Sequence, residues 1–308
     1  MQNADIWFSP WVLGVLGLCI GSFLNVVIYR WPVIMEREWL LDAAAQLEDP
    51  DTLERVGKLA SAQAKTVSNA AKVVSTQLSS QTPLTLSTPR SRCPQCGHVL
   101  AWHENIPLLG WLKLGGKCSS CKTAIPKRYP FIELLTGLLF ALVAWQVGPQ
   151  PLALLWCGFV AFLIAMSGID WDTTLLPDTL TLPLLWLGLL AAYMHWTVPL
   201  ADAVLGAMAG YLSLWSVYWL FKKATGKEGM GYGDFKLLAA LGAWLGWQML
   251  IPIVLMSSVI GAVVGIAMKL SSSLREGKYV PFGPFLAGAG LVVMFAGQAR
   301  VLSWLGWV

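Results

Sequence analysis

Long apolar stretches separated by short polar connections dominate the pattern of residues along the chain. A membrane-spanning helix needs about 20 mainly apolar residues, and shorter runs are tolerated inside a helix bundle. The candidate spans lie at residues 6–29, 131–147, 151–169, 180–196 and 200–221, in two parts of 235–270 divided at Gly246, and from 282 to about 304. The pattern predicts an all-α polytopic membrane protein with about eight transmembrane helices.

The composition agrees with this pattern. Hydrophobic residues make up 56% of the 308-residue chain and charged residues 12%, whereas about 25% of the residues in an average soluble protein are charged. The 17 Trp and 29 Gly residues suit membrane interfaces and close helix packing. Together these values exclude a disordered chain, a collagen-like fibre and a disulfide-rich secreted scaffold.

The placement of the charges predicts the orientation of the chain. With about eight spans, every Lys and Arg except Arg300 falls on the same side, and the positive-inside rule makes that side cytoplasmic. Both termini are then periplasmic. The net charge of +4 therefore reflects topology and is no argument for nucleic-acid binding. No Lys or Arg precedes the first span and Arg30 follows it, so this span is not expected to be a cleavable signal peptide.

The same pattern divides the chain into three parts. We expect a first transmembrane helix at 1–30, a cytoplasmic domain at 31–129 and a seven-helix membrane bundle at 130–308. Within the cytoplasmic domain, residues 36–80 are rich in Ala, Gln, Ser and alternating charge, and Asp51 begins a segment typical of a helix start. One or two exposed helices are expected here, either as a docking arm or as a solvated spacer.

Two Cys-x-x-Cys pairs follow this helical segment. Their members are Cys93, Cys96, Cys118 and Cys121. Two such pairs present four thiolates that can close a tetrahedron around Zn²⁺, so the spacing indicates a zinc-ribbon-like domain with a structural metal. A redox pair and reduced structural cysteines are the alternatives, and the duplicated pair in a reducing compartment favours zinc over both.

Acidic residues stand at the edges of two apolar runs. Asp170, Asp172 and Asp178 lie in a short connection without Lys or Arg, and Asp234 begins a later span after a glycine-rich turn. Ionisable groups beside membrane spans are functional candidates. These four are consistent with a divalent-cation site, a proton relay, solvated helix ends, or an aspartic-protease dyad in which two carboxylates share one proton.

Motifs along almost the whole chain resemble those of the bacterial type IV prepilin peptidases, which are membrane aspartyl proteases with a Gly-x-Gly-Asp motif. The central motif is Gly231-Tyr232-Gly233-Asp234, followed by Phe235-Lys236-Leu237-Leu238. The others are Gly21-Ser22-Phe23-Leu24-Asn25, the four cysteines, Asn105-Ile106-Pro107, Arg128-Tyr129-Pro130 with Glu133, the block from Asp170 to Leu176-Pro177-Asp178, and Phe282-Gly283-Pro284-Phe285. Residues 36–80 match no motif of that family.

The resemblance implies a function and a set of site residues. Asp170 and Asp234 would be the catalytic dyad, cleaving prepilins and pseudopilins after a Gly at the cytoplasmic face of the inner membrane. The supporting residues would be Asp172, Asp178, Gly231, Gly233 and Lys236. N-methylation of the new N-terminus with S-adenosylmethionine is also implied, with Gly116, Lys117 and Glu133 as candidates. Structural roles account equally well for these three residues: a ribbon turn for Gly116 and Lys117, and a helix cap for Glu133.

Three other classes of function stay open at the level of sequence. A transporter or channel with a zinc-stabilised domain needs polar groups at the bilayer midplane, and most spans carry none. A thiol oxidoreductase would use the Cys-x-x-Cys pairs. A related intramembrane protease with another substrate is disfavoured by the motifs outside the Gly-x-Gly-Asp segment.

Overall fold

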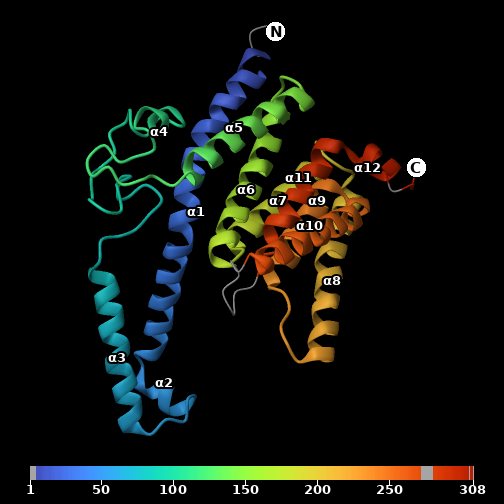
Figure 1. Cartoon of the computed structure of the whole chain (residues 1–308). Coiled ribbons are helices and arrows are strands. Elements are labelled where there is room, and N and C mark those ends of the chain that lie inside the picture. The colour runs from blue at the N-terminus through green and yellow to red at the C-terminus, as the bar shows by residue number, and fades with distance from the viewer. Residues whose placement is uncertain (1–4, 272–279, 305, 308) are drawn as a thin grey trace.

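The computed structural model describes residues 5–271, 280–304 and 306–307 (Figure 1). In this part of the chain the regular structure is helical, apart from two isolated β-bridges, Arg92 with Val99 and Lys117 with Ala124. The helices are η1 (Asp5–Phe8), α1 (Pro10–Leu47), α2 (Pro50–Arg55), α3 (Ser61–Ser80), α4 (Leu109–Lys113), α5 (Arg128–Val147), α6 (Leu152–Thr173), α7 (Asp178–Tyr193), α8 (Leu200–Thr225), α9 (Tyr232–Leu245), η2 (Trp247–Met249), α10 (Leu250–Leu270), α11 (Gly283–Ala296) and α12 (Gln298–Trp304). The prediction of an all-α, multi-pass membrane protein is confirmed.

The predicted number of about eight spans is not confirmed. Among the described residues, five helices are long and apolar enough to cross a membrane: α1, α5, α6, α8 and η2 with α10. A sixth span results if α11 and α12, which are bent by 104°, count as one. The remaining two predicted spans, α7 and α9, have 16 and 14 residues, short of the about 20 that a bilayer requires.

Two glycines explain where the C-terminal helices break. Gly246 has φ +83° and ends α9, as expected from the sequence. Gly297 has φ +81° and separates α11 from α12, so the last predicted span is not one straight helix. Both conformations lie in the left-handed region that glycine adopts without a steric penalty. Arg275 and Lys278, which contributed to the predicted orientation, lie outside the described residues.

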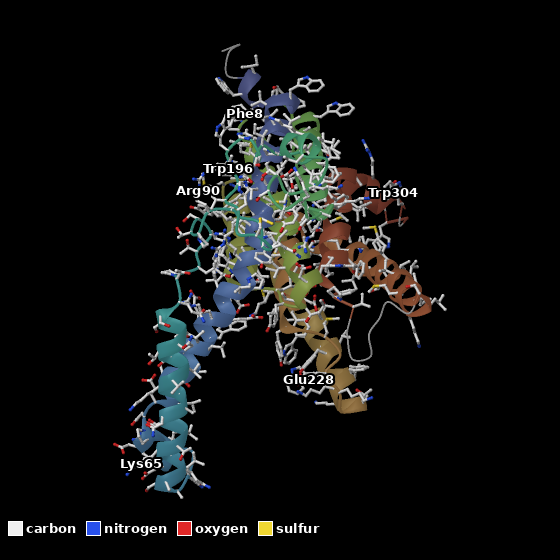
Figure 2. All side chains as sticks on the ribbon, turned by 60° about the vertical axis from the view of Figure 1, so that its left-hand side comes forward. Phe8, Lys65, Arg90, Trp196, Glu228 and Trp304 are labelled. Atoms are coloured by element: carbon white, nitrogen blue, oxygen red, sulfur yellow. The ribbon has the colours of Figure 1, made fainter. Side chains whose placement is uncertain are left out.

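Helix α1 continues well beyond the membrane boundary expected near residue 30. It extends over 38 residues to Leu47 and includes Pro32. The helix-forming residues after Pro32 carry it into a projecting hairpin completed by α2 and α3. Figure 2 shows this hairpin pointing away from the membrane bundle, with Lys65 near its far end. The first part of the segment expected to form exposed helices is therefore a continuation of α1.

Helix α9 lies at the centre of the bundle, which accounts for its short length. Most of its side chains are buried, against α7, α8 and α11. Gly206 of α8 and Gly242 of α9 approach so closely that a Cβ on either would lie 2.2 Å from the carbonyl oxygen of the other. The indole of Trp244 donates a hydrogen bond to the carbonyl of Leu184 in α7, at 2.8 Å. This packing fixes the helix that carries Asp234.

Candidate active site and cysteine module

Asp170 lies in the last turn of α6 and is held by a backbone donor from another helix. Only 4% of the Asp170 surface is exposed to solvent. The N–H of Gly283, the first residue of α11, donates to Oδ2 of Asp170 at 2.9 Å. Because the first N–H groups of a helix have no partner inside the helix, the start of α11 is well suited to hold a carboxylate.

Asp234 lies in the first turn of α9 and is 7% exposed. Leu176, in the connection between α6 and α7, packs against the glycines beside both acids: a Cβ at Gly233 would lie 2.6 Å from Leu176 Cβ, and a Cβ at Gly283 would lie 3.0 Å from Leu176 Cδ1. Glycine at these two positions therefore lets three helices converge on one buried pair of carboxylates.

The other two acids of the connection have different surroundings. Asp172 is ion-paired with Arg128 at 2.6 Å, and Asp178 is ion-paired with Lys236 at 2.6 Å. Both pairs are partly exposed to solvent. The cations belong to α5 and α9, so the two pairs fasten both ends of the connection that follows Asp170.

These contacts bear on the alternatives left open by the sequence. Burial of Asp170 and Asp234 argues against solvated helix ends for this pair. Within the described residues, the group of three or more Asp, Glu, His or Cys side chains that could hold a metal ion is the cysteine tetrad. It includes neither Asp170 nor Asp234. Two buried carboxylates at neighbouring helix ends fit the general acid–base chemistry of an aspartic protease.

The four cysteines come together as the spacing predicts. Their Sγ atoms all lie within 4.8 Å of one another, with 3.7 Å between Cys93 and Cys121 and 3.9 Å between Cys96 and Cys118. A tetrahedral site with Zn–S bonds of about 2.3 Å has S···S edges of about 3.8 Å. The donor set and its spacing therefore fit Zn²⁺, and four protein ligands leave no open position for a substrate.

The two cysteine turns are built in the same way. The N–H of Gly97 donates to the carbonyl of Cys93, and the N–H of Lys122 donates to the carbonyl of Cys118. Gly97 has φ +71° and Lys122 has φ +59°, so both turns place the fourth residue after the first Cys in the left-handed region. Each turn is closed by one β-bridge, between Arg92 and Val99 or between Lys117 and Ala124.

A carboxylate braces the two turns outside the sulfur cluster. Glu104 lies 3.1 Å from His98 Nε2, which in turn lies 3.1 Å from the hydroxyl of Ser119. The Ser119 hydroxyl, the backbone N–H of Ala101 and His98 lower the pKa of Glu104 to about 2. The side chain therefore stays ionised and links residues from both turns.

The three candidates for methyl transfer do not share one environment. Gly116 is buried under the Trp111 ring, and its carbonyl accepts a hydrogen bond from Ile125. Lys117 is exposed. Glu133, on α5, is buried and accepts the N–H of Leu108 at 2.8 Å. The contacts of Gly116 and Glu133 give both residues structural roles.

Comparison with protein families accounts for most of the chain. The family description "Bacterial Peptidase A24 N-terminal domain" matches residues 15–147, and "Type IV leader peptidase family" matches residues 157–266. The chain belongs to the type IV leader peptidase family. The N-terminal match contains the cysteine module, and the other match contains Asp170 and Asp234.

Curated relatives agree along almost their full length. Proteins named "Prepilin leader peptidase/N-methyltransferase" from Stutzerimonas stutzeri and Pseudomonas aeruginosa are 49% and 48% identical over 295 residues, covering 94% of this chain and 92% and 91% of theirs. One of the same name from Aeromonas salmonicida is 48% identical over 300 residues, covering 94% of this chain and 93% of its own. No solved structure matched the chain.

Some residues of the site are not assigned a role by the sequence. Gly283 and Arg128 were recognised as parts of motifs, but their contacts with Asp170 and Asp172 join positions far apart in the chain. Asn25 likewise donates from its side chain to the carbonyl of Tyr129 at 3.1 Å, joining two of the motifs. The sequence showed only that these residues belong to motifs and did not show which residues they contact.

Proposed function

We propose that this protein is a membrane aspartic endopeptidase. It removes the leader of type IV prepilins and pseudopilins after a Gly and then methylates the new N-terminal residue. The observation that carries the proposal is the burial of Asp170 and Asp234 at the ends of two helices, where Gly233 and Gly283 both pack against Leu176. The relatives that match along the whole chain are named for both activities.

The dyad requires one ionised and one protonated carboxyl group. The ionised carboxylate takes a proton from water while the water oxygen bonds to the peptide carbonyl carbon. The protonated carboxyl group gives its proton to the carbonyl oxygen, producing a tetrahedral intermediate. As the C–N bond breaks, the leaving nitrogen takes the proton from the carboxyl group that water protonated. The other carboxylate takes a proton from a hydroxyl of the intermediate, and the carbonyl re-forms as the leader's new carboxyl group. The N–H of Gly283 positions Asp170 for these steps.

Six other residues support this geometry. Asp172 and Asp178, through Arg128 and Lys236, hold the connection between α6 and α7. Gly231 and Gly233 form the turn into α9, and the lack of a side chain at Gly233 admits Leu176. These contacts fix the distance between the two acids, on which the sharing of one proton depends.

Methyl transfer draws on the N-terminal half of the chain. S-adenosylmethionine supplies the methyl group for the new amino terminus. The resemblance directs attention to Gly116, Lys117 and Glu133, near the cysteine module. Zn²⁺ held by Cys93, Cys96, Cys118 and Cys121 would stabilise this module, because metal binding in such sites contributes directly to folding.

The placement of charge supports an orientation in the inner membrane. With α7 and α9 counted among the eight predicted spans, the cation-rich connections and the cysteine module would face the cytoplasm, where the leader of the substrate lies, and both termini would be periplasmic. Asp170 and Asp234 adjoin connections on the same side as Arg128 and Lys236, at the edge of the apolar helices.

Cleavage of a detergent-solubilised prepilin tests the dyad. Asp170→Asn and Asp234→Asn are each expected to abolish cleavage, whereas both should still methylate a precleaved pilin in the presence of radiolabelled S-adenosylmethionine. Asp202→Asn is the matched control, because Asp202 lies in the first turn of α8 and bonds to Trp247, away from the dyad. Cleavage at the wild-type rate by either dyad variant would falsify the assignment.

A transporter or a thiol oxidoreductase gains no support. The relatives that match the full chain are named for proteolysis and methylation. Cysteines arranged as a four-sulfur cluster also differ from an isolated redox pair.

A further inference from the structure

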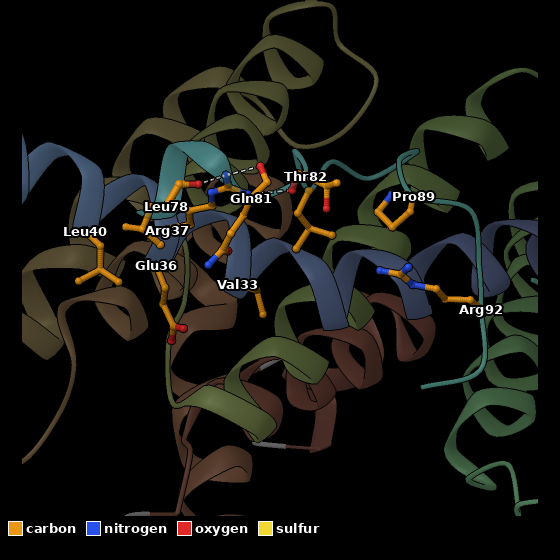
Figure 3. A pocket seen from close by; sticks show the side chains of 10 residues that line it. Val33, Glu36, Arg37, Leu40, Leu78, Gln81, Thr82, Pro89 and Arg92 are labelled. Atoms are coloured by element: carbon orange, nitrogen blue, oxygen red, sulfur yellow. Dashed lines mark hydrogen bonds between the residues drawn. The ribbon is translucent and has the colours of Figure 1, made fainter. Parts of the chain in front are cut away.

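A groove lies on the cytoplasmic extension of α1, apart from the buried dyad. It has a volume of about 500 Å³ and is bordered by one face of α1, the end of α3 and the segment that leads to Cys93 (Figure 3). The residues that the argument uses are Val33, Glu36, Arg37, Leu40, Leu78 and Arg92. Small-molecule sites usually enclose about 300–1,000 Å³ and combine apolar walls with a few polar groups. The groove has both properties.

One of its charged groups has a structural role. The guanidinium of Arg37 donates to the carbonyl oxygens of Leu78, Gln81 and Thr82. These contacts, drawn in Figure 3, cap the end of α3 and satisfy carbonyls that have no partner within the helix. Arg37 therefore shapes the groove and has little capacity left for a ligand.

The other two charged groups of the groove are free. Neither the carboxylate of Glu36 nor the guanidinium of Arg92 makes a hydrogen bond or ion pair with the described residues. The groove thus offers one unpaired anion and one unpaired cation between the apolar side chains of Val33, Leu40 and Leu78. A ligand that complements it carries a positive group, a carboxylate and a flat apolar portion.

We propose that this groove binds S-adenosylmethionine, an inference that rests on the proposed function. Arg92 binds the carboxylate of the methionyl part by a charge-assisted hydrogen bond. Glu36 complements the positive charge of the ligand and accepts hydrogen bonds from its ribose hydroxyls. The apolar side chains of α1 and α3 cover the adenine ring.

The position of the groove suits a second step on the same substrate. Two residues before Val33, the indole of Trp31 donates to the hydroxyl of Thr179, in the first turn of α7, at 3.0 Å. Helix α1 therefore joins the groove to the helix that follows the Asp170 connection. At the other end, Arg92 immediately precedes Cys93, which joins the groove to the cysteine module.

The groove has charged groups available to a ligand, whereas the region around Gly116 has two of its three candidates already engaged. There, Gly116 and Glu133 are engaged by protein groups, whereas the side chains of Glu36 and Arg92 bond to none of the residues that the structure describes. A site for a charged small molecule needs such unengaged groups, because a ligand otherwise has to displace existing hydrogen bonds.

Equilibrium binding of radiolabelled S-adenosylmethionine to the purified full chain tests the proposal. Glu36→Gln and Arg92→Gln are each expected to weaken binding about tenfold, the usual scale for the loss of one charge-assisted hydrogen bond. Glu38→Gln and Arg90→Gln are matched controls, since both residues are exposed, lie two positions away and do not line the groove. The controls should bind with the affinity of the wild type, and unchanged melting temperatures would show that all four variants are folded.

Photocrosslinking of the labelled donor to the wild type locates the site independently. Peptides containing residues 33–40 or 78–92 should carry the label. Wild-type affinity in both groove variants, or a label confined to residues 116–133, overturns the groove as the site. Methylation of a precleaved pilin by the wild type is measured in parallel: methylation with no label in the groove refutes this inference alone, whereas no methylation at all refutes that part of the proposed function.

Discussion

At the scale of single residues, Gly283 places a steric requirement directly on the carboxylate of Asp170. A Cβ added there would lie 2.7 Å from Oδ2 of Asp170, so Gly283→Ala must displace either the carboxylate or the start of α11. We expect cleavage to fall on the order of 100-fold, since small misplacements of a reacting group have effects of this size. Rates of prepilin cleavage would measure the change.

Gly288, on the same helix, is the matched control for this prediction. A Cβ there would meet nothing within 4 Å, so Gly288→Ala should cleave at about the wild-type rate. Equal rates for the two variants would show that the close approach at Gly283 is not needed for activity.

The two cysteine turns have different residues at equivalent positions, so substitutions there should have opposite effects on stability. Gly97 and Lys122 both have positive φ, a conformation that disfavours residues with a Cβ by roughly 1–2 kcal/mol. Gly97→Ala should destabilise the module by about 1 kcal/mol, whereas Lys122→Gly should stabilise it or leave it unchanged. The rate of zinc transfer to a chelator measures this, and faster loss from Lys122→Gly than from Gly97→Ala would contradict the structure.

The chemistry of individual residues was readable from the sequence only where residue type and local spacing determine it. Each Cys-x-x-Cys turn already holds two thiols close together. The four cysteines therefore form the expected cluster once the two turns meet. The free charges of Glu36 and Arg92 gave no signal, because their lack of a partner depends on how α1, α3 and residues 81–92 pack.

At the scale of elements, the ion pair between Arg128 and Asp172 links α5 to the end of α6. A partly exposed pair contributes only about 0–1 kcal/mol to stability, so its main effect should be on the position of Asp170. Arg128→Asp and Asp172→Arg should each lower kcat for cleavage about fivefold, equivalent to about 1 kcal/mol. The double variant restores an ion pair in reversed order and should recover most of the rate.

A double-mutant cycle of cleavage rates measures this coupling. Lys223→Asp is a control for charge reversal, because Lys223 lies in the last turn of α8 away from both acids. Additive losses in the double variant would show that the ion pair does not position α6.

The elements differ in how far the sequence determined them. Gly246 ends α9 as expected because a left-handed glycine acts locally. The continuation of α1 to Leu47 was missed, because hydropathy marks where a membrane ends, whereas a helix ends only where its hydrogen bonding or capping changes. Helix α9 has the apolar character of a membrane span, but burial by α7, α8 and α11 explains that character equally well.

At the scale of the whole molecule, an all-α membrane fold with a cysteine module followed from composition, periodicity and spacing. The number of spans stays unconfirmed, since a buried short helix and a lipid-exposed long one have similar composition. The meeting of Asp170 and Asp234 was expected from the resemblance of motifs; their burial and the amide of Gly283 became visible only with the packing of α6, α9 and α11.

The two halves of the molecule should respond differently to loss of the metal. Asp170 and Asp234 are buried in a helix bundle whose hydrophobic clusters contain none of the four paired cysteines. Removing Zn²⁺ should unfold the cysteine module, since metal binding in such sites is part of folding. Cleavage should then stay within about threefold of the native rate, whereas methylation should fall at least about tenfold, because the wall of the groove that contains Arg92 adjoins Cys93.

Parallel assays of prepilin cleavage and of methylation of a precleaved pilin, before and after chelation, measure this separation. Cys96→Ser should reproduce the effect of chelation without a chelator, and Cys19→Ser, an exposed cysteine of α1 outside the cluster, should not. Equal loss of both activities would show that the module also holds the bundle together, through contacts such as that between Leu108 and Glu133. Rapid alkylation of the four thiols before any chelation would instead show that they hold no metal, because bound thiolates are protected from alkylation.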